Sequence, residues 1–330
     1  ICGNWPADII FDMQGFTLGA RPQLMAHRCA GIQVNFLAFP GTSGASYIDY
    51  VIVDRFVAAV EHAEDEFTEK LAILPRSYQA TFFDKPVPIP VRGSAQWKEL
   101  RSKEGLSTST SIFVFANFNK QDKIDPSSFL AIMQSLARVP YSVLWLLEPS
   151  GSHESAVIVK QNLRAAAKNA GILPDRLIFA KRVEREDHIH RMSAGDLFLD
   201  SFYYGAHTTA TDAMRGGMPL LTLAGGSFSS RVGMSLLHGM NSKRAPSLIT
   251  HSIQEFVDVA VEIAIAQTEL PMGSPDIKSI GTKLIEPDVG QNGCDLFNWK
   301  SYSKDFEVMS KMMMEVKQLS SKNMHIVLAK

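Results

Sequence analysis

Between residues 112 and 223, short apolar runs alternate with longer stretches that have helical periodicity. The apolar runs are bounded by polar or turn residues, which is typical of buried strands. Strands that alternate with helices predict a parallel sheet with helices on both faces. Strands are expected at residues 112–115, 143–147, 177–179, 197–199 and 220–223, with helices at 126–138 and 155–170 between them.

One of these strands leads into a hydroxyl-rich helix start. The apolar run bounded by Asp196 and Asp200 is followed by a short aromatic loop, and His207 then opens a helix expected over residues 210–215. Backbone N–H groups in the first turn of a helix have no intrahelical acceptor, so they are free to bind an anion. The pattern predicts a phosphate site at the carboxyl edge of the sheet.

The first third of the chain predicts a second α/β lobe. Strands are expected at 7–11, 32–39 and 50–53, and an acidic amphipathic helix at 57–71. The small residues at 40–44 form either a loop that lets a ligand approach the backbone or a plain strand-to-helix turn. Later helices are expected at 253–267 and 302–319, the last packing back across the first lobe.

A change in amino-acid composition marks the expected boundary between the lobes. Three prolines at 86–90 exclude a regular helix, and residues 107–111 form a Ser/Thr tract. The predicted division is therefore a first lobe at 1–95, a linker at 96–110, and a second lobe at 111–330 that includes a closing C-terminal helix.

Composition limits the partners. The 330 residues are 45% apolar and 20% charged, and a net charge of −1 gives no reason to expect nucleic acid or a membrane surface. Cys2, Cys29 and Cys294 have no metal-ligand spacing and form no even disulfide set, and there is no Asn-x-Ser/Thr sequon, which suits a reducing compartment. The chain begins at Ile1 without a leader pattern, so we expect a fragment whose first lobe is truncated.

Four segments in one order resemble the catalytic half of the O-linked N-acetylglucosamine transferases. They are an N-terminal signature at residues 12–21 and 39–45, a segment at 118–126, a segment at 186–191, and the run Gly205-Ala-His-Thr-Thr-Ala-Thr-Asp212. The resemblance implies a GT-B type fold of two Rossmann-like lobes.

The resemblance also implies roles for two catalytic residues. A sugar-nucleotide donor has a diphosphate leaving group that gains negative charge, and this chain has no Asp-x-Asp metal motif. Lys123 is expected to contact the diphosphate, and His207 to donate to the phosphate or the sugar. The alternatives are a solvated lysine before a helix and a histidine that only caps one.

Other positions match donor contacts of the family. By resemblance, Val183 meets uracil through its backbone, and His188 and Arg191 lie at the base end. The alternative for Arg185 and Arg191 is that both belong to a solvated face. The remaining donor-side positions are Lys120, Arg185, Thr208, Thr209, Asp212, Ala38 and Pro40. Two of these depart from the family's animal members: Lys120 replaces glutamine, and Ala38 replaces a glycine.

The function implied is transfer of N-acetylglucosamine from UDP-GlcNAc to Ser or Thr hydroxyls of proteins in the cytoplasm and nucleus. The expected reaction is inverting and needs no metal or cofactor, and a longer parent is expected to carry upstream tetratricopeptide repeats. By resemblance, part of the acceptor-side machinery precedes Ile1. The resemblance therefore leaves open whether the fragment alone is active. One rival is a SPINDLY-type O-fucosyltransferase using GDP-fucose, although that branch has glycine where His207 stands. The other rival is a non-catalytic interaction scaffold.

Overall fold

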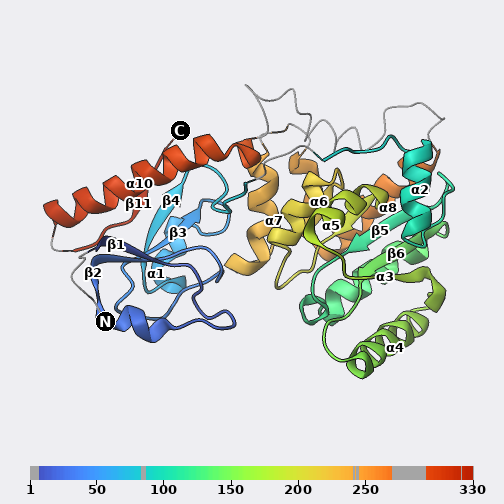
Figure 1. The fold of residues 1–330 in the computed structure, drawn as a ribbon, viewed down its shortest axis with the longest axis horizontal. Helices are drawn as coiled ribbons and strands as arrows, with labels where there is room; N and C mark the ends of the chain where they lie inside the picture. The colour runs from blue at the N-terminus through green and yellow to red at the C-terminus, as the bar shows by residue number, and fades with distance from the viewer. Residues whose placement is uncertain are drawn as a thin grey trace. The chain divides into compact units, whose positions relative to one another are not determined.

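The structure, a computed structural model, describes residues 7–82, 87–240, 242, 245–269, 295–320 and 322–329 (Figure 1). The chain divides into two compact units built from discontinuous segments. The first unit comprises residues 1–82, 227–241 and 295–330, and the second comprises 83–226 and 242–294. Among the described residues, no helix is long and apolar enough to cross a membrane.

The first unit is built on a parallel sheet with the order β1-β2-β3-β4-β11. Its strands are rich in Ile, Val and Leu, as expected where a sheet is buried on both faces. The strands are β1 (Ala7–Asp12), β2 (Ala30–Asn35), β3 (Tyr50–Asp54), β4 (Lys70–Leu74) and β11 (Ile326–Val327). The helices are η1 (Pro22–His27), η2 (Val60–His62), α1 (Ala63–Glu66), α7 (Phe228–Gly239), η8 (Asp295–Phe297) and α10 (Trp299–Leu319).

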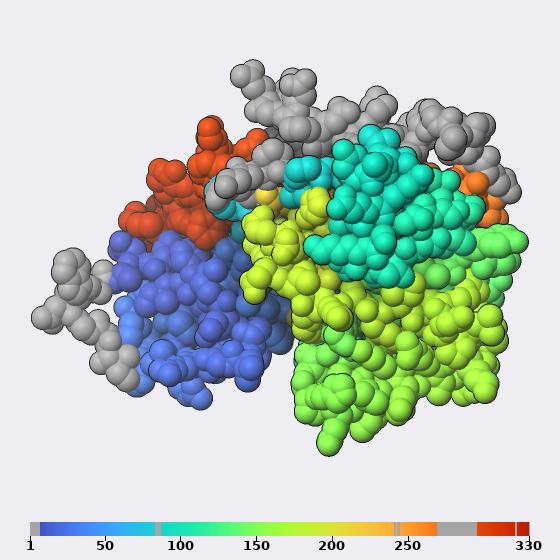
Figure 2. All heavy atoms as spheres, turned by 45° about the vertical axis from the view of Figure 1, so that its right-hand side comes forward, coloured from blue at the N-terminus to red at the C-terminus, as the bar shows by residue number. Residues whose placement is uncertain are grey.

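The long helix α10 packs on this sheet. Met309 and Met313 are fully buried in a core that also contains Val34 of β2 and Ile52 of β3. The ring of Phe306 lies 5.1 Å from that of Phe11 and 5.3 Å from that of Phe36. In Figure 2 the red atoms of this helix lie directly against the blue atoms of the strands.

The second unit contains a six-stranded parallel sheet with the order β10-β9-β8-β5-β6-β7. Its strands are β5 (Phe113–Asn117), β6 (Ser142–Leu147), β7 (Leu177–Ala180), β8 (Leu197–Leu199), β9 (Leu220–Leu223) and β10 (Ile249–Thr250). The α-helices are α2 (Ala95–Lys103), α3 (Pro126–Arg138), α4 (His153–Asn169), α5 (Arg185–Arg191), α6 (Thr208–Arg215) and α8 (Ile253–Glu269). Short 3-10 helices are η3 (Gln121–Lys123), η4 (Pro174–Arg176), η5 (Met192–Ala194) and η6 (Ala245–Leu248). The predicted strand–helix alternation is confirmed.

The helix predicted at 57–71 is wrong. Only η2 and the four-residue α1 form there, and Leu71 belongs to β4. The buried carboxylate of Asp54 accepts hydrogen bonds from the amides of Phe56 (2.8 Å) and Val57 (3.1 Å). These bonds turn the chain directly after β3, because they engage the amides in a local turn instead of a helix.

The division into units differs from the one predicted. The expected linker contains α2, whose Arg101 is fully buried and donates from Nη2 to Asp196 Oδ2 at 2.5 Å within the second unit. Helices α7 and α10 group with the first unit instead of the second. For α10 this confirms the expectation that the last helix packs back across the first lobe, and its apolar packing on β2, β3 and β4 explains the placement.

Cys29 is disulfide-bonded, which the count of three cysteines without an even disulfide set did not predict. Cys2, Cys294 and part of the proline-rich run at 85–90 lie outside the described residues.

Candidate functional site

Lys123 lies in the second unit, on the connection that follows β5. Its position is held from both sides: Gln121 Nε2 donates to Leu147 O at 2.6 Å, and the Asp125 carboxylate caps α3 through the amides of Ser127 (2.9 Å) and Ser128 (3.1 Å). The Lys123 ammonium donates to Gly205 O at 3.2 Å. It therefore reaches the loop that follows β8, the strand next to β5 in the sheet.

The loop after β8 is organised by Asp200, which is 1% exposed. Its carboxylate accepts from the amides of Ser201 (2.8 Å) and Ala206 (2.7 Å), from Thr222 Oγ1 (3.0 Å) and from Asn119 Nδ2 (3.3 Å). These partners come from the ends of three neighbouring strands. From the sequence, Asp200 marks only the end of a strand; an acid at the carboxyl end of a buried parallel strand is the signal that identifies it as a site residue.

His207 is the N-cap residue of α6, and its ring stacks on Tyr204 with a centroid separation of 5.2 Å and an interplanar angle of 20°. The Lys123 ammonium lies 3.9 Å from the centroid of the same Tyr204 ring. The structure thus brings the two predicted catalytic residues to one aromatic side chain, which the sequence analysis did not single out. Thr208 and Thr209 form the first turn of α6, where backbone amides are available to an anion.

Burial shifts the pKa of both charged groups. It lowers the pKa of Lys123 to about 8, an effect that the nearby carboxylates of Asp200 and Asp122 partly oppose. It raises the pKa of Asp200 to about 6, against the four hydrogen bonds that favour the charged form. At neutral pH both groups are mainly charged, so the site presents a cation backed by a buried anion.

Arg185 and Asp212 form an ion pair between α5 and α6, with Nη2 2.9 Å from Oδ1. Burial raises the pKa of Asp212, although the Arg185 guanidinium opposes this. The arginine side chain is 59% exposed, whereas the carboxylate is 9% exposed. Arg185 is therefore the member of the pair that is open to a ligand, and Asp212 orients it.

His188 and Arg191 share one face of α5, as their spacing predicts. Arg191 donates from Nε (3.1 Å) and Nη2 (2.7 Å) to His188 Nδ1, and from Nη1 to Lys181 O (2.5 Å). Burial and the charges of Arg191 and Arg182 lower the pKa of His188 to about 4, so the imidazole is neutral and accepts at Nδ1. Arg191 is 1% exposed, which makes it a support for His188 more than a surface for a ligand.

The structure places the remaining predicted donor-side residues outside the Lys123 cluster of the second unit or in the first unit. Lys120 pairs with Asp122 at 2.7 Å on the surface, and Val183 is 44% exposed just before α5. Ala38 and Pro40 belong to the first unit, in the connection after β2. The small-residue loop beyond Pro40 is held by Glu69, which accepts from Thr42 Oγ1 (2.7 Å) and the Ser43 amide (2.6 Å).

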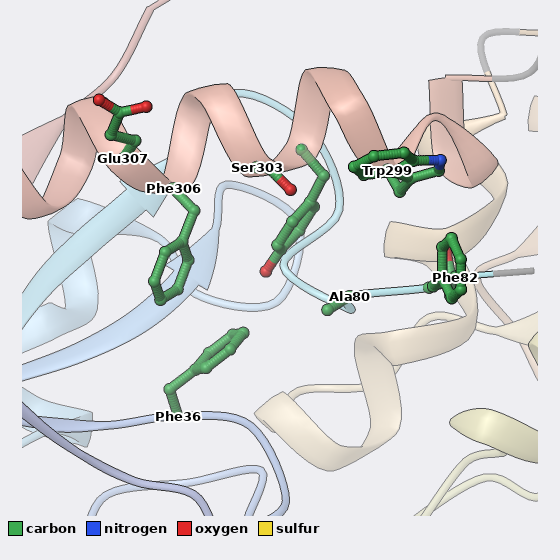
Figure 3. A pocket seen from close by; sticks show the side chains of 9 residues that line it. Phe36, Ala80, Phe82, Trp299, Ser303, Phe306 and Glu307 are labelled. Carbon is green, nitrogen blue, oxygen red and sulfur yellow. The ribbon is translucent and has the colours of Figure 1, made fainter.

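The first unit also contains an apolar pocket of about 480 Å³ beside α10 (Figure 3). Aromatic rings dominate the lining, and the rings of Phe82 and Trp299 are nearly perpendicular, with centroids 5.7 Å apart. The described lining residues are Phe36, Ala80, Thr81, Phe82, Trp299, Tyr302, Ser303, Phe306 and Glu307. This set contains a carboxylate and no Lys or Arg, so the pocket suits an apolar or aromatic group more than a diphosphate.

Metal ligands do not gather in the part of the chain that the structure describes. No three His, Cys, Asp or Glu side chains lie there in an arrangement that could hold a metal ion.

The sequence matches the family described as glycosyl transferase family 41 over residues 6–84 and 98–306. It is 31% identical over 299 residues to the probable UDP-N-acetylglucosamine–peptide N-acetylglucosaminyltransferase SEC of Arabidopsis thaliana. It is 24% identical over 401 residues to the UDP-N-acetylglucosamine–peptide N-acetylglucosaminyltransferase of Caenorhabditis elegans. These matches each cover 91% of this chain but only 28% and 33% of the relatives, so the chain spans about a third or less of their length.

Solved structures show the same fold. A variant of the O-GlcNAc transferase of Thermobaculum terrenum superposes with a TM-score of 0.74 at 22% identity, over 94% of this chain and 54% of that one. Sucrose-phosphate synthase from Thermosynechococcus elongatus gives 0.51 at 14% identity, over 82% and 59%. At these identities the likeness concerns the fold alone, and it confirms the predicted GT-B type α/β architecture.

Proposed function

Because the chain belongs to glycosyl transferase family 41, we propose that it is the donor-binding and catalytic part of a protein glycosyltransferase. Its donor is UDP-N-acetylglucosamine, and its acceptors are Ser or Thr hydroxyls of proteins in the cytoplasm and nucleus. Support for the donor and for peptide acceptors comes from the names of the Arabidopsis and C. elegans relatives. Upstream tetratricopeptide repeats would belong to the longer parent.

One observation carries this proposal: Lys123 and His207 meet at Tyr204, beside the first turn of α6. A diphosphate placed at that helix start would meet a cation, an imidazole and free backbone amides. All three stabilise the negative charge that develops on the leaving group. The reaction is then metal-independent, because these groups take the role that a divalent cation has elsewhere, and direct attack by the acceptor hydroxyl inverts the anomeric centre.

The rest of the second-unit site would hold the nucleoside. Arg185, oriented by Asp212, donates to the ribose or phosphate region, and the neutral His188 lies at the base end together with the backbone of Val183. In this proposal Arg191 acts through His188, since its guanidinium is already bonded to that ring and to Lys181 O.

The test is transfer of labelled N-acetylglucosamine from UDP-GlcNAc to a Ser/Thr peptide in EDTA, in a longer protein that contains this chain. Lys123→Met should lower kcat by roughly 100- to 1000-fold, the usual effect of removing one donor to a developing anion, while the protein stays folded. Lys98→Met on the exposed face of α2 is the matched control and should leave turnover unchanged. Efficient transfer from GDP-fucose, or turnover only with Mn²⁺ or Mg²⁺, would contradict the proposal.

A further inference from the structure

Tyr204 contacts both proposed catalytic side chains, but the proposed reaction gives its ring no role of its own. Its ring meets the Lys123 ammonium at 3.9 Å from the centroid and stacks on the His207 imidazole at 5.2 Å. An ammonium at this distance from an aromatic face is attracted by the ring's quadrupole, and more strongly where water is excluded. Tyr204 is half-buried, and burial raises the pKa of its phenol, so the ring stays neutral at working pH.

The backbone around this ring is fixed. The Asp200 carboxylate accepts from the amides of Ser201 and Ala206, which lie on either side of Tyr204 in the sequence. Gly205 O, directly after the ring, accepts from the Lys123 ammonium at 3.2 Å. The loop after β8 therefore presents a carbonyl and an aromatic face to the same cation.

These two contacts leave the ammonium able to serve a ligand. A lysine ammonium carries three N–H donors, and the carbonyl takes one of them. The ring face attracts the cation but carries no net charge. It therefore does not neutralise the ammonium as a second carboxylate would. A lysine held in this way keeps its charge and direction while it still has a donor for an anion.

We propose that Tyr204 is a positioning residue, whose ring holds the Lys123 ammonium and the His207 imidazole in the orientation that a nucleotide diphosphate requires. The identity of the anion rests on the proposed function, whereas the contact between ring and ammonium does not. The first experiment therefore uses no ligand.

This experiment follows acetylation of Lys123 against pH by mass spectrometry in the unliganded chain, because only the neutral amine reacts. Other charged groups near the amine are Asp200 after β8, and Asp122 and Lys120 on the Lys123 segment. The titratable ring of His207 stacks on the same tyrosine. Tyr204→Phe keeps the ring and should leave the midpoint near that of the wild type. Tyr204→Leu keeps an apolar side chain without a π face, and should move the midpoint to lower pH.

The direction in which the acetylation midpoint shifts distinguishes a ring that stabilises the Lys123 ammonium from one that only covers it. If the ring only shields Lys123 from water, Tyr204→Leu admits water and moves the midpoint up, toward an ordinary lysine. An unchanged or raised midpoint would therefore overturn the proposal. Tyr203→Leu is the matched control, because it makes the same change at the neighbouring tyrosine, whose side chain is 69% exposed, and it should not move the midpoint.

A second measurement connects the ring to the ligand. UDP affinity at pH 8, measured by calorimetry, should fall roughly two- to tenfold in Tyr204→Leu, the range expected for one cation–π contact, and should recover in Tyr204→Phe. Wild-type affinity in Tyr204→Leu would overturn the positioning role. If the midpoint shifts as expected but the wild type does not bind UDP, the donor assignment fails and the contact stands.

Discussion

At the scale of single residues, the site depends on charges kept in a buried setting. Lys123 is attracted by Asp200 and Asp122 but loses hydration, and the loss of hydration dominates, since its pKa falls to about 8. Asp200 shows the opposite response of an acid to the same burial, with a pKa raised to about 6. The pKa of each group is close to neutral pH. A moderate change in pH therefore alters the fraction of each group that is charged, and with it the electric field in the site.

Asp200 should make stability depend on pH below neutrality. Its pKa in the folded state is above the ordinary value of 3.8, so the folded state binds the proton more tightly than the unfolded state does. The resulting stabilisation is fully present below about pH 4, declines as pH rises, and is lost above about pH 6. The difference corresponds to about 3 kcal/mol.

This prediction is tested with Asp200→Asn, whose amide oxygen keeps the loop amides paired while its NH2 donates to the Thr222 hydroxyl. Urea unfolding at several pH values should show the wild type losing stability relative to this variant between pH 4 and 6. Asp175→Asn on the exposed η4 is the control. A constant difference between wild type and Asp200→Asn across that range would contradict the prediction.

Single residues also mark where sequence reasoning succeeded and where it stopped. His207, Thr208 and Thr209 could be placed from the sequence, because a hydroxyl-rich helix start after a buried strand is a local pattern. Tyr204 could not be identified, because nothing in an aromatic loop indicates which cation its ring will meet 81 residues away in sequence. The partner depends on the pairing of β5 with β8, which only the folded sheet establishes.

At the scale of elements, continuous apolar runs identified the strands of the second unit because those strands are buried on both faces. The same reasoning failed at 57–71, where apolar residues at helical spacing are divided among a turn, two very short helices and a strand. Asp54 decided the outcome by binding the amides of Phe56 and Val57. A buried side chain that competes for backbone amides is invisible to a periodicity argument.

Helix α3 offers a test of how an element positions the site. Its N-cap Asp125 lies two residues after Lys123 and accepts from the amides of Ser127 and Ser128, and these hydrogen bonds fix the chain directly after η3. Asp125→Ala should destabilise the protein by about 0.5–2 kcal/mol and should also weaken UDP binding, because the Lys123 segment loosens.

Ser152→Ala is the matched control, since Ser152 caps α4 by accepting from the Ser155 amide. It should cost a similar amount of stability without affecting UDP binding. Both quantities can be measured by urea unfolding and calorimetry on the same samples. Equal loss of UDP affinity in the two variants would mean that general stability, and not the placement of Lys123, governs binding.

At the scale of the whole molecule, the chain passes between two units that are each discontinuous in sequence. The sequence predicted two α/β lobes and a last helix that packs back across the first, but the division 1–95, 96–110 and 111–330 assigned α7 and α10 to the second lobe. Helical periodicity shows that α10 has an apolar face and does not show which sheet that face covers. Met309 and Met313 supply the answer, because both are buried in the core of the first unit.

Removing residues 295–330 should therefore affect one sheet and spare the other. Without α10, the apolar faces of β2, β3 and β4 lose Met309, Met313 and the ring of Phe306, and β4 loses its partner β11. Amide hydrogen exchange in these three strands should accelerate toward the rates of an unprotected chain. Without a packed core to expose, opening of the strands costs less free energy. Strands β5, β6 and β8 pair only within the second unit's sheet, so their protection should remain.

Met313→Ala, which removes one buried side chain and should cost about 2–5 kcal/mol, should give a smaller change in β2, β3 and β4. Uniform loss of protection in both sheets after the deletion would show that the two units fold as one cooperative body.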